Sequence, residues 1–401
     1  MKFLNGIRIV SFNHFVMGPL GVQILADLGA DVIAVESLDG AFQRNWSAGN
    51  RYIDDVSLTF AFANRNKRSL ALDLKSEAGK EVARRLIKSA DVLAENFRPG
   101  VMDRLGLGYA KAKEINPALI YAAATGYGSD GPYKDRPGQD LLLQAMSGIA
   151  AITGREPDES RAVGGSVVDH HGAALFALGI MAALLGRARN NEGCRVDVSL
   201  LGAALDLQAE GITSFLNGKR PASIRQPGAS AGWSAPGGYG VFPARDGSVA
   251  ISLATPAKLA QALDCPALNE FAESDVFTRT REISALVEQQ CRMYSVEELL
   301  GRFVALDIWH TRVNDYAMMS EDPQVIHNKH LIETELPGAS KPVRVLSHPV
   351  RYDNQVPPVY LPPQKLGAQS REILGEIGYG SEEIETLIAQ RVVGVPVEVE
   401  A

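Results

Sequence analysis

The sequence predicts an α/β protein with a Rossmann-like, doubly wound parallel sheet in a large domain and a smaller inserted α+β domain. Three observations predict this class. Strand-like and helix-like segments alternate through residues 1–200, which is typical of a parallel sheet with crossover helices. The regular alternation of strands and helices ends at residues 227–240, a run rich in Gly, Pro and Ser. With 46% apolar and 22% charged residues, the 401-residue chain has the composition of a folded protein, not a disordered or fibrous one.

The first strand–helix–strand unit occupies residues 6–36. Residues 6–12 (GIRIVSF) predict a strand, a helix is expected from Pro19 to Leu28 just after Gly18, and residues 31–36 (DVIAVE) predict the second strand. The spacing is that of an ordinary βαβ unit, whose two strands lie parallel.

The same alternation continues along the chain. We expect strands at 69–74, 91–95, 119–123 and 195–200, and helices at 76–90, 101–115, 140–151 and through the apolar run 173–185. This run is shorter than the roughly 20 residues that cross a bilayer, so we interpret it as a core helix. Residues 126–138 hold four glycines and two prolines and predict a loop at a strand end, where such sheets carry ligands.

The change in the pattern of predicted strands and helices sets the expected domain boundaries. We expect residues 1–200 to form the first part of the large domain, 201–225 a linker, 226–330 the small α+β domain, and 331–401 a return to the large domain. Within the small domain, residues 239–253 predict a β-hairpin that turns at Asp246-Gly247. A helix is expected at 370–377 in the returning segment.

Charge limits the possible partners. The chain has 47 acidic and 40 basic residues and a net charge of -7, which is unfavourable for binding nucleic acid or an anionic membrane; neither partner is expected. An anionic ligand would need a local basic patch. The segment Asn64–Arg68 (NRNKR) precedes a strand, and Arg98 and Arg104 follow the next strand; such side chains pair with phosphate. On these residues alone, a solvated run of charges is an equal alternative.

Cysteine usage indicates the compartment. Cys194, Cys265 and Cys291 are odd in number and widely spaced, and the amino-terminal residues lack the apolar stretch of a signal peptide. We expect a cytoplasmic protein whose thiols are core or surface residues.

Missing motifs disfavour several chemistries. The turn Gly18-Pro19-Leu20-Gly21 lacks the G-x-G-x-x-G of dinucleotide-binding folds, although Glu36 ends the second strand where a ribose-binding acid would lie. A solvated strand end is the simpler interpretation of Glu36. The sequence has no P-loop or zinc-protease motif. The seven histidines form no converging set, so no metal is expected.

A carboxylate is the remaining candidate for chemistry. Asp169 follows the glycine-bearing stretch 163–168 (VGGSVV) and stands at the start of the apolar helix. An isolated acid at this position is most often a helix cap.

The chain resembles the class III CoA-transferase family, which contains formyl-CoA and carnitine CoA-transferases and the α-methylacyl-CoA racemases. The resemblance covers nearly the whole chain and rests on five motifs in the family's order. They are Gly18-Pro19 with 28–36 (LGADVIAVE), 66–69 (NKRS), 90–100 (ADVLAENFRPG), 126–128 (GYG) and the segment that ends at Asp169.

The resemblance implies a CoA-transferase that acts on acyl-CoA and small carboxylic acids, with a CoA thioester as substrate and no permanently bound cofactor. Asp169 would be the acyl-accepting nucleophile; with a reference pKa near 3.9 it would be ionised at neutral pH without a general base. The backbone amides of Gly237 and Gly238 would stabilise the oxyanion, although a plain linker is the alternative there. Two subunits would interlock as rings in a homodimer. The residues implied to seat CoA are Asn66, Lys67, Arg68, Asn96, Phe97, Arg98 and Arg104.

The racemase branch is the first alternative. It shares the fold and the aspartate but adds a catalytic histidine within the stretch that corresponds to residues 136–140. Gln139 occupies this place and cannot shuttle protons, which favours transfer and leaves Asp140 as a second polar group of the pocket. A CoA-binding protein without turnover is the other alternative.

Two further differences bear on the substrate. Val16 replaces the glutamine of formyl-CoA transferases and Ser37 replaces an arginine, so formyl transfer to oxalate is not expected. Val16, with Phe15, Trp46 and Tyr127, would suit a larger and less polar acyl pocket; an equal alternative is that these side chains are core residues.

Overall fold

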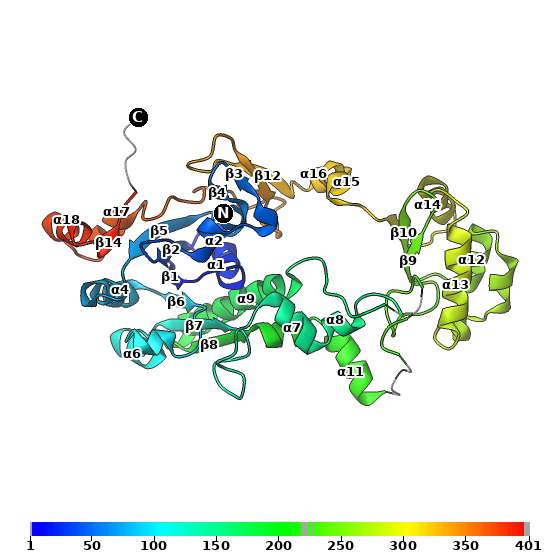
Figure 1. Ribbon diagram of the computed structural model, residues 1–401, viewed down its shortest axis with the longest axis horizontal. Coiled ribbons are helices and arrows are strands. Elements are labelled where there is room, and N and C mark those ends of the chain that lie inside the picture. Colours follow the sequence, from blue (N-terminus) through cyan, green and yellow to red (C-terminus); the bar gives the residue numbers. More distant parts are fainter. Residues whose placement is uncertain (1, 157, 219–220, 222, 227, 397–401) are drawn as a thin grey trace. The chain divides into compact units, whose positions relative to one another are not determined.

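The computed structural model describes residues 2–156, 158–218, 221, 223–226 and 228–396 (Figure 1). The chain divides into two compact units. Unit 1 comprises Met1–Leu143, Ser166–Leu207 and Pro323–Ala401, and unit 2 comprises Gln144–Gly165 and Gln208–Asp322.

A seven-stranded sheet forms the centre of unit 1. Its strands are β1 (Arg8–Phe12), β2 (Asp31–Glu36), β5 (Lys67–Leu72), β6 (Val92–Glu95), β7 (Ile120–Thr125), β8 (Arg195–Ser199) and β14 (Val393–Gly394). The order across the sheet is β14-β5-β2-β1-β6-β7-β8. All neighbours are parallel except β14, which pairs antiparallel with β5. The predicted α/β class with a large parallel sheet is confirmed.

The strand order defines where a ligand is expected. Chain order places β2 and β5 on one side of β1, and β6, β7 and β8 on its other side. The direction of winding therefore reverses between β1 and β6. In open α/β sheets, ligands bind outside the carboxyl ends of the strands at such a switch point.

Helices cover both faces of the sheet. Those in unit 1 are α1 (Met17–Asp27), α2 (Phe42–Asn45), α3 (Leu58–Ala63), α4 (Glu77–Ser89), α5 (Val101–Arg104), α6 (Tyr109–Ile115), α9 (Val167–Asn190), α10 (Leu200–Asp206), α16 (Pro323–His327), α17 (Ser370–Glu376) and α18 (Ser381–Ala389). Helix α7 (Asp140–Ser147) begins in unit 1 and ends in unit 2. Alternate strand residues such as Val10 and Phe12 join one apolar core with α4, α6, α17 and α18.

Unit 1 also has two small antiparallel pairs, β3 (Tyr52–Ile53) with β4 (Val56–Ser57), and β12 (Leu331–Thr334) with β13 (Val343–Leu346).

Helices α1 and α9 pack closely on each other. A β-carbon on Gly21 would lie 3.0 Å from the carbonyl oxygen of Ala173, and one on Gly172 would lie 3.0 Å from Met17 Cε. These two glycines therefore allow the helix backbones to approach. Among the described residues, α9 is the one helix that is long and apolar enough to span a bilayer. Its Phe176 and Ile180 are fully buried, but Leu178 and Leu185 are 63% and 58% exposed, so the helix predicted to be buried in the core is buried on one side only.

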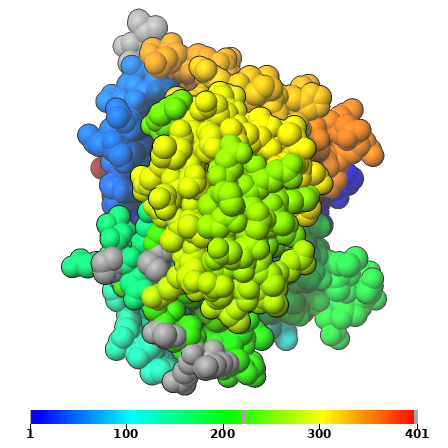
Figure 2. Space-filling model, turned by 90° about the vertical axis from the view of Figure 1, so that its right-hand side faces the viewer, coloured from blue at the N-terminus to red at the C-terminus, as the bar shows by residue number. Residues whose placement is uncertain are grey.

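Unit 2 holds a smaller antiparallel sheet with helices. Its strands β9 (Gly240–Pro243), β10 (Ser248–Ile251) and β11 (His310–Arg312) lie in the order β11-β10-β9. Its helices are α8 (Ile149–Ile152), α11 (Ala209–Asn217), α12 (Pro256–Ala262), α13 (Thr280–Cys291), α14 (Val296–Ala305) and α15 (Tyr316–Glu321). The predicted hairpin turn at Asp246-Gly247 connects β9 and β10. Figure 2 shows the yellow-green and yellow residues of this unit packed as one continuous body.

The structure divides the chain differently from the boundaries expected from sequence. Residues 144–165 join unit 2, and the expected linker 201–225 is largely the two helices α10 and α11. Residues 219, 220 and 222 of that stretch lie outside the described residues. Helix α10 begins at once because the Ser199 hydroxyl, at the end of β8, accepts a hydrogen bond from Gly202 N–H and caps it.

Candidate active site

The loops that follow β1 and β6 are tied together at the switch point. The His14 N–H donates to Asn96 Oδ1 at 2.9 Å, and Asn96 Nδ2 donates to the His14 carbonyl at 2.7 Å. The His14 and Phe97 rings lie 5.4 Å apart. Burial lowers the pKa of His14, which keeps the ring neutral. Asn96 and Phe97, which the resemblance implied for CoA, therefore lie where this sheet is expected to bind a ligand.

Glu95 shapes the loop that carries these residues. Its buried carboxylate accepts a hydrogen bond from Phe97 N–H at 2.8 Å, and the Tyr121 hydroxyl lies 3.4 Å away. Burial raises the pKa of Glu95 to about 7. The role of Glu95 was not predicted from the sequence, although an acid that ends an otherwise apolar strand directly before Asn96 is a signal for it.

Two cations follow the same strand. Arg98 and Arg104 are exposed, Arg98 in the loop after β6 and Arg104 at the end of α5. Within the described part of the chain, neither guanidinium has an acidic partner, so both charges are available to an anion. This arrangement suits the phosphates of CoA, although the role of the two arginines stays a prediction.

The basic run Asn64–Arg68 does not form the phosphate-binding patch considered from the sequence, because its side chains bond to other groups of the protein. Arg65 is buried and paired with Asp27 at 2.6 Å. Arg68 pairs with Asp31, at the amino end of β2, and with Glu376. Asn66 is buried and bonds Asp27 and the backbone N–H groups of residues 360 and 361. Strand β5 runs in the same direction as β6, and Asn66 and Arg68 lie at the start of β5. They are therefore at the amino edge of the sheet, whereas Asn96, which follows the end of β6, is at the opposite, carboxyl edge.

Lys67 is an internal cation. Only 3% of the residue is exposed. Its ammonium donates to the carbonyls of Pro19 and Ala63 and to Asn64 Oδ1, at 2.8, 2.6 and 3.0 Å. Burial lowers its pKa to about 7. The three ammonium hydrogens are therefore used within the protein, which makes Lys67 a structural tie between α1, α3 and β5.

Glu36 is also internal. Its carboxylate pairs with Arg44 through two bonds of 2.6 and 2.7 Å and is buried. The expectation of a solvated strand end was wrong, because Arg44 of α2 covers this carboxylate.

Asp169 lies in the first turn of α9 and is largely buried. Asp140, the first residue of α7, contacts the same helix end: its Oδ1 accepts the N–H of Val168 at 2.8 Å and that of Asp169 at 3.1 Å. Desolvation and the Asp140 charge raise the pKa of Asp169 to about 7. The expectation that Asp169 is fully ionised at neutral pH was therefore wrong, since the reference pKa ignores its surroundings.

The glycine-rich loop 126–138 delivers Asp140 to this position. A β-carbon on Gly126 would lie 2.7 Å from Gly138 Cα, so only glycine allows the two ends of the loop to meet. Gln139, at the place of the racemase histidine, is exposed, and its carbonyl accepts Leu143 N–H in the first turn of α7.

The helix pair α1–α9 brings Asp169 toward the switch point. Gly172, one turn after Asp169, packs on Met17 at the start of α1. Val16 is half-buried directly before Met17 and follows the β1 loop. Unit 1 thus supplies Asp169, Asp140, Val16, Asn96 and Arg98 from segments at the carboxyl edge of one sheet.

The predicted oxyanion donors are engaged elsewhere. Gly237 N–H donates to the Val276 carbonyl at 2.7 Å, and Gly238 N–H donates to Ser284 Oγ at 3.2 Å. Both glycines belong to unit 2, whereas Asp169 belongs to unit 1. With these bonds in place, neither amide is available to an oxyanion.

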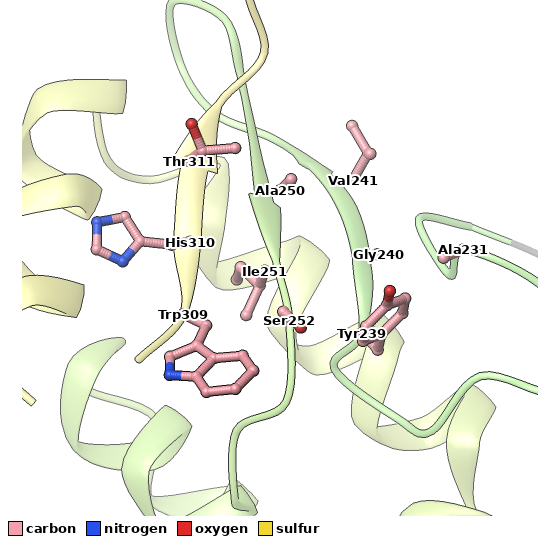
Figure 3. Close-up of a pocket in the computed structure, with 10 residues that line it drawn as sticks. All are labelled: Ala231, Tyr239, Gly240, Val241, Ala250, Ile251, Ser252, Trp309, His310 and Thr311. Carbon is pink, nitrogen blue, oxygen red and sulfur yellow. The ribbon is translucent and has the colours of Figure 1, made fainter. Parts of the chain in front are cut away.

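A pocket of about 370 Å³ lies in unit 2 (Figure 3). Its walls are mostly apolar and include Val241 of β9, Ile251 of β10 and Trp309, just before β11. No carboxylate or thiol lines it, so it holds no counterpart of the Asp169 carboxyl. Throughout the described residues, no three His, Cys, Asp or Glu side chains gather as metal ligands.

Comparisons with known proteins identify the family. Residues 4–370 match the family model described as CoA-transferase family III. A succinyl-CoA:glutarate CoA-transferase of Mus musculus is 31% identical over 98% of this chain and 91% of its own length. An acetyl-CoA:oxalate CoA-transferase of Acetobacter aceti is 40% identical over 60% of this chain and 61% of its own. The crystal structure of a CAIB/BAIF family protein from Brucella suis matches with a TM-score of 0.80 at 29% identity, over 93% of this chain and 99% of that one. The chain therefore belongs to CoA-transferase family III and is a CoA-transferase.

Proposed function

We propose that this enzyme moves CoA from a donor acyl-CoA to an acceptor carboxylic acid, with Asp169 as covalent nucleophile. The observation that carries the proposal is the Asp169 carboxyl, placed by Asp140 at the start of α9 and held largely out of water. A carboxylate with a raised pKa is a stronger nucleophile than a solvated one, and a half-ionised group is still available at neutral pH.

The first half-reaction begins with attack of an Asp169 carboxylate oxygen on the thioester carbonyl. A C–O bond forms, the C–S bond breaks, and CoA leaves as a thiolate, leaving a mixed anhydride. The thiolate then attacks the aspartyl carbonyl of the anhydride. The donor acid leaves as a carboxylate, and Asp169 carries CoA as a thioester.

The second half-reaction runs this sequence in reverse with the acceptor. The acceptor carboxylate attacks the aspartyl thioester, CoA thiolate leaves, and a second anhydride forms. CoA thiolate attacks the acceptor's acyl carbonyl, which restores the Asp169 carboxylate. One thioester replaces another and no net proton transfer is needed.

We place the CoA-binding site at the switch point between β1 and β6. Asn96 lies beside the loop after β1, followed by Phe97, and the exposed Arg98 and Arg104 suit phosphate oxygens. Small carboxylic acids are the acceptor class of the named relatives, whose names include oxalate and glutarate.

A homodimer completes the proposal. Unit 1 exposes a row of apolar side chains along α9, including Leu178 at 63% and Leu185 at 58%. Exposed apolar surface on a long helix is typical of a subunit interface. Light scattering on the purified protein tests this directly; a monomer at micromolar concentration contradicts it.

Covalent labelling tests the chemistry. The enzyme is incubated briefly with a panel of acyl-CoAs, trapped with hydroxylamine or borohydride, and analysed by peptide mass spectrometry. We expect the mark on the peptide that contains Asp169, and no mark in Asp169→Asn. Exchange of the α-proton with deuterated solvent, without any mark or acceptor requirement, would instead identify proton-transfer chemistry.

A further inference from the structure

A continuous row of aromatic rings extends from the switch point across the surface of unit 1. We call Phe97, His14, Phe15, Phe42 and Trp46 the aromatic row. Successive ring centroids lie 5.4, 5.1, 4.7 and 5.7 Å apart, and the last pair is stacked at an interplanar angle of 27°. Phe15, Phe42 and Trp46 are 39%, 48% and 45% exposed. Three large apolar side chains therefore present their surfaces to solvent together.

The row is held in place by buried polar groups beneath it. Phe42 begins α2 and Trp46 directly follows its last residue. Both are exposed, while the intervening Gln43 is 2% exposed and Arg44 makes its two bonds to Glu36. The Trp46 carbonyl accepts a hydrogen bond from Ser57 Oγ at 2.7 Å. The short helix is thus fixed from inside with its aromatic face outward.

Phe15 adopts an unfavourable backbone conformation. Its φ of 61° lies in the left-handed region, which is uncommon for a bulky residue and costs free energy. The Phe15 N–H donates to Gln43 Oε1 at 3.0 Å, so the same buried glutamine fixes both Phe15 and α2. A strained conformation that places an apolar ring in solvent is typical of a binding surface, not of folding alone.

One member of the row is joined through the chain to the helix pair that carries Asp169. Phe15 is followed by Val16 and by Met17, which packs on Gly172 one turn from Asp169. Phe97, at one end of the row, directly precedes Arg98, whose charge would neutralise a phosphate. None of the row's five side chains carries a full charge at neutral pH, since the pKa of His14 is lowered, and the nearby Arg44 is committed to Glu36.

We propose that Phe15, Phe42 and Trp46 bind the acyl group of the substrate, and that this enzyme therefore prefers acyl-CoAs with an apolar, planar acyl group such as an arylacetyl group. The inference rests on the proposed function, which requires the acyl carbonyl to lie at Asp169. Flat apolar groups stack on aromatic side chains, whereas a small carboxylate such as oxalate gains nothing from them. The Val16 side chain has no polar atom that could bind the carboxylate of such a small acid.

Binding to a non-reacting variant tests the preference without turnover. Dissociation constants of phenylacetyl-CoA and acetyl-CoA are measured by calorimetry on Asp169→Asn, alone and combined with Phe42→Ala, Phe42→Leu or Trp46→Ala. We expect phenylacetyl-CoA to bind about tenfold more tightly than acetyl-CoA, and each alanine variant to reduce that ratio about three- to tenfold. Phe42→Leu, which keeps apolar volume but not the flat ring, should show an intermediate ratio. Tyr316→Ala, which removes an aromatic side chain that is 85% exposed in unit 2, is the matched control and should leave the ratio unchanged.

Three results would overturn the proposal. One is a ratio near one in the parent protein. Another is an equal loss of affinity for both thioesters, which would assign the row to CoA itself. The third is dissociation of the oligomer by Phe42→Ala or Trp46→Ala in light scattering, which would assign the row to a subunit contact. Failure of the transfer function is seen separately, as loss of Asp169 labelling in the otherwise unaltered enzyme, and does not alter the measured ratio.

Discussion

The carboxylate of Asp140 accepts the backbone N–H of Asp169 at 3.1 Å, and its negative charge contributes to the raised pKa of that residue. One side chain therefore both positions the start of α9 and influences the ionisation of the candidate nucleophile. The two effects can be separated, because an amide oxygen can accept the same hydrogen bond without carrying a charge.

The first prediction concerns the pH dependence of the wild-type enzyme. Only the ionised form of Asp169 can attack a carbonyl, and its pKa is about 7 in the folded protein. We expect kcat/KM to rise with pH through an apparent pKa near 7 and then level off. Steady-state rates across this range check it. A rate that is level from weakly acidic to weakly alkaline pH would contradict the raised pKa.

The second prediction concerns Asp140→Asn. The variant keeps an oxygen for the N–H groups of Val168 and Asp169 but loses the like charge, so the rising limb of the pH profile should move to lower pH. Asp140→Ala should also lose both of these hydrogen bonds, at a cost of about 1 kcal/mol in unfolding free energy. Asp55→Asn, at an exposed acid of the β3–β4 turn, is the control. An unshifted limb in Asp140→Asn would show that its charge does not act on Asp169.

The third prediction concerns the stability of Asp169→Asn. The folded-state pKa of Asp169 is about 7 and the ordinary value is 3.8, so the folded state binds the proton more tightly than the unfolded state. Stability is therefore lost as pH rises between these two values. The variant removes this loss and should be more stable than the wild type by about 4 kcal/mol at alkaline pH. Thermal unfolding at several pH values checks it, and the difference should vanish toward pH 4.

The fourth prediction concerns Arg98→Gln and Arg104→Gln. If these guanidinium groups bind phosphate, each change should raise KM for acyl-CoA by roughly tenfold, equivalent to about 1.4 kcal/mol, with a smaller effect on kcat. The wild-type KM should also rise with salt. Arg189→Gln, an exposed arginine at the end of α9, serves as the control. Equal KM values in all three variants would place the phosphates elsewhere.

The fifth prediction concerns Lys67→Met. Three acceptors, on Pro19, Ala63 and Asn64, lose their donor, and a buried unsatisfied acceptor costs about 1–3 kcal/mol. We expect a clear loss in unfolding free energy and little change in KM for acyl-CoA in the folded protein. Urea titration and steady-state kinetics measure the two quantities. A raised KM with unchanged stability would restore Lys67 to the CoA site.

The sequence by itself determined the local elements and the family. Strands such as Asp31–Glu36 and the hairpin turn at Asp246-Gly247 were predicted because short apolar runs bounded by polar residues, and turn dipeptides, are local signals. The short helix α2 was missed, because its stability comes from Arg44 and Gln43 bonding to distant parts of the chain.

Only the tertiary structure decided which of these residues act together. Arg68 and Arg98 look alike in the sequence, but parallel strand packing places Arg68 at the amino edge, paired with Asp31 and Glu376. It places Arg98 at the carboxyl edge, exposed and with no acidic partner among the described residues. The pKa of Asp169 likewise depends on burial and on Asp140, which comes from another helix. Charge pairing and desolvation are properties of three-dimensional neighbours, so no local sequence pattern records them.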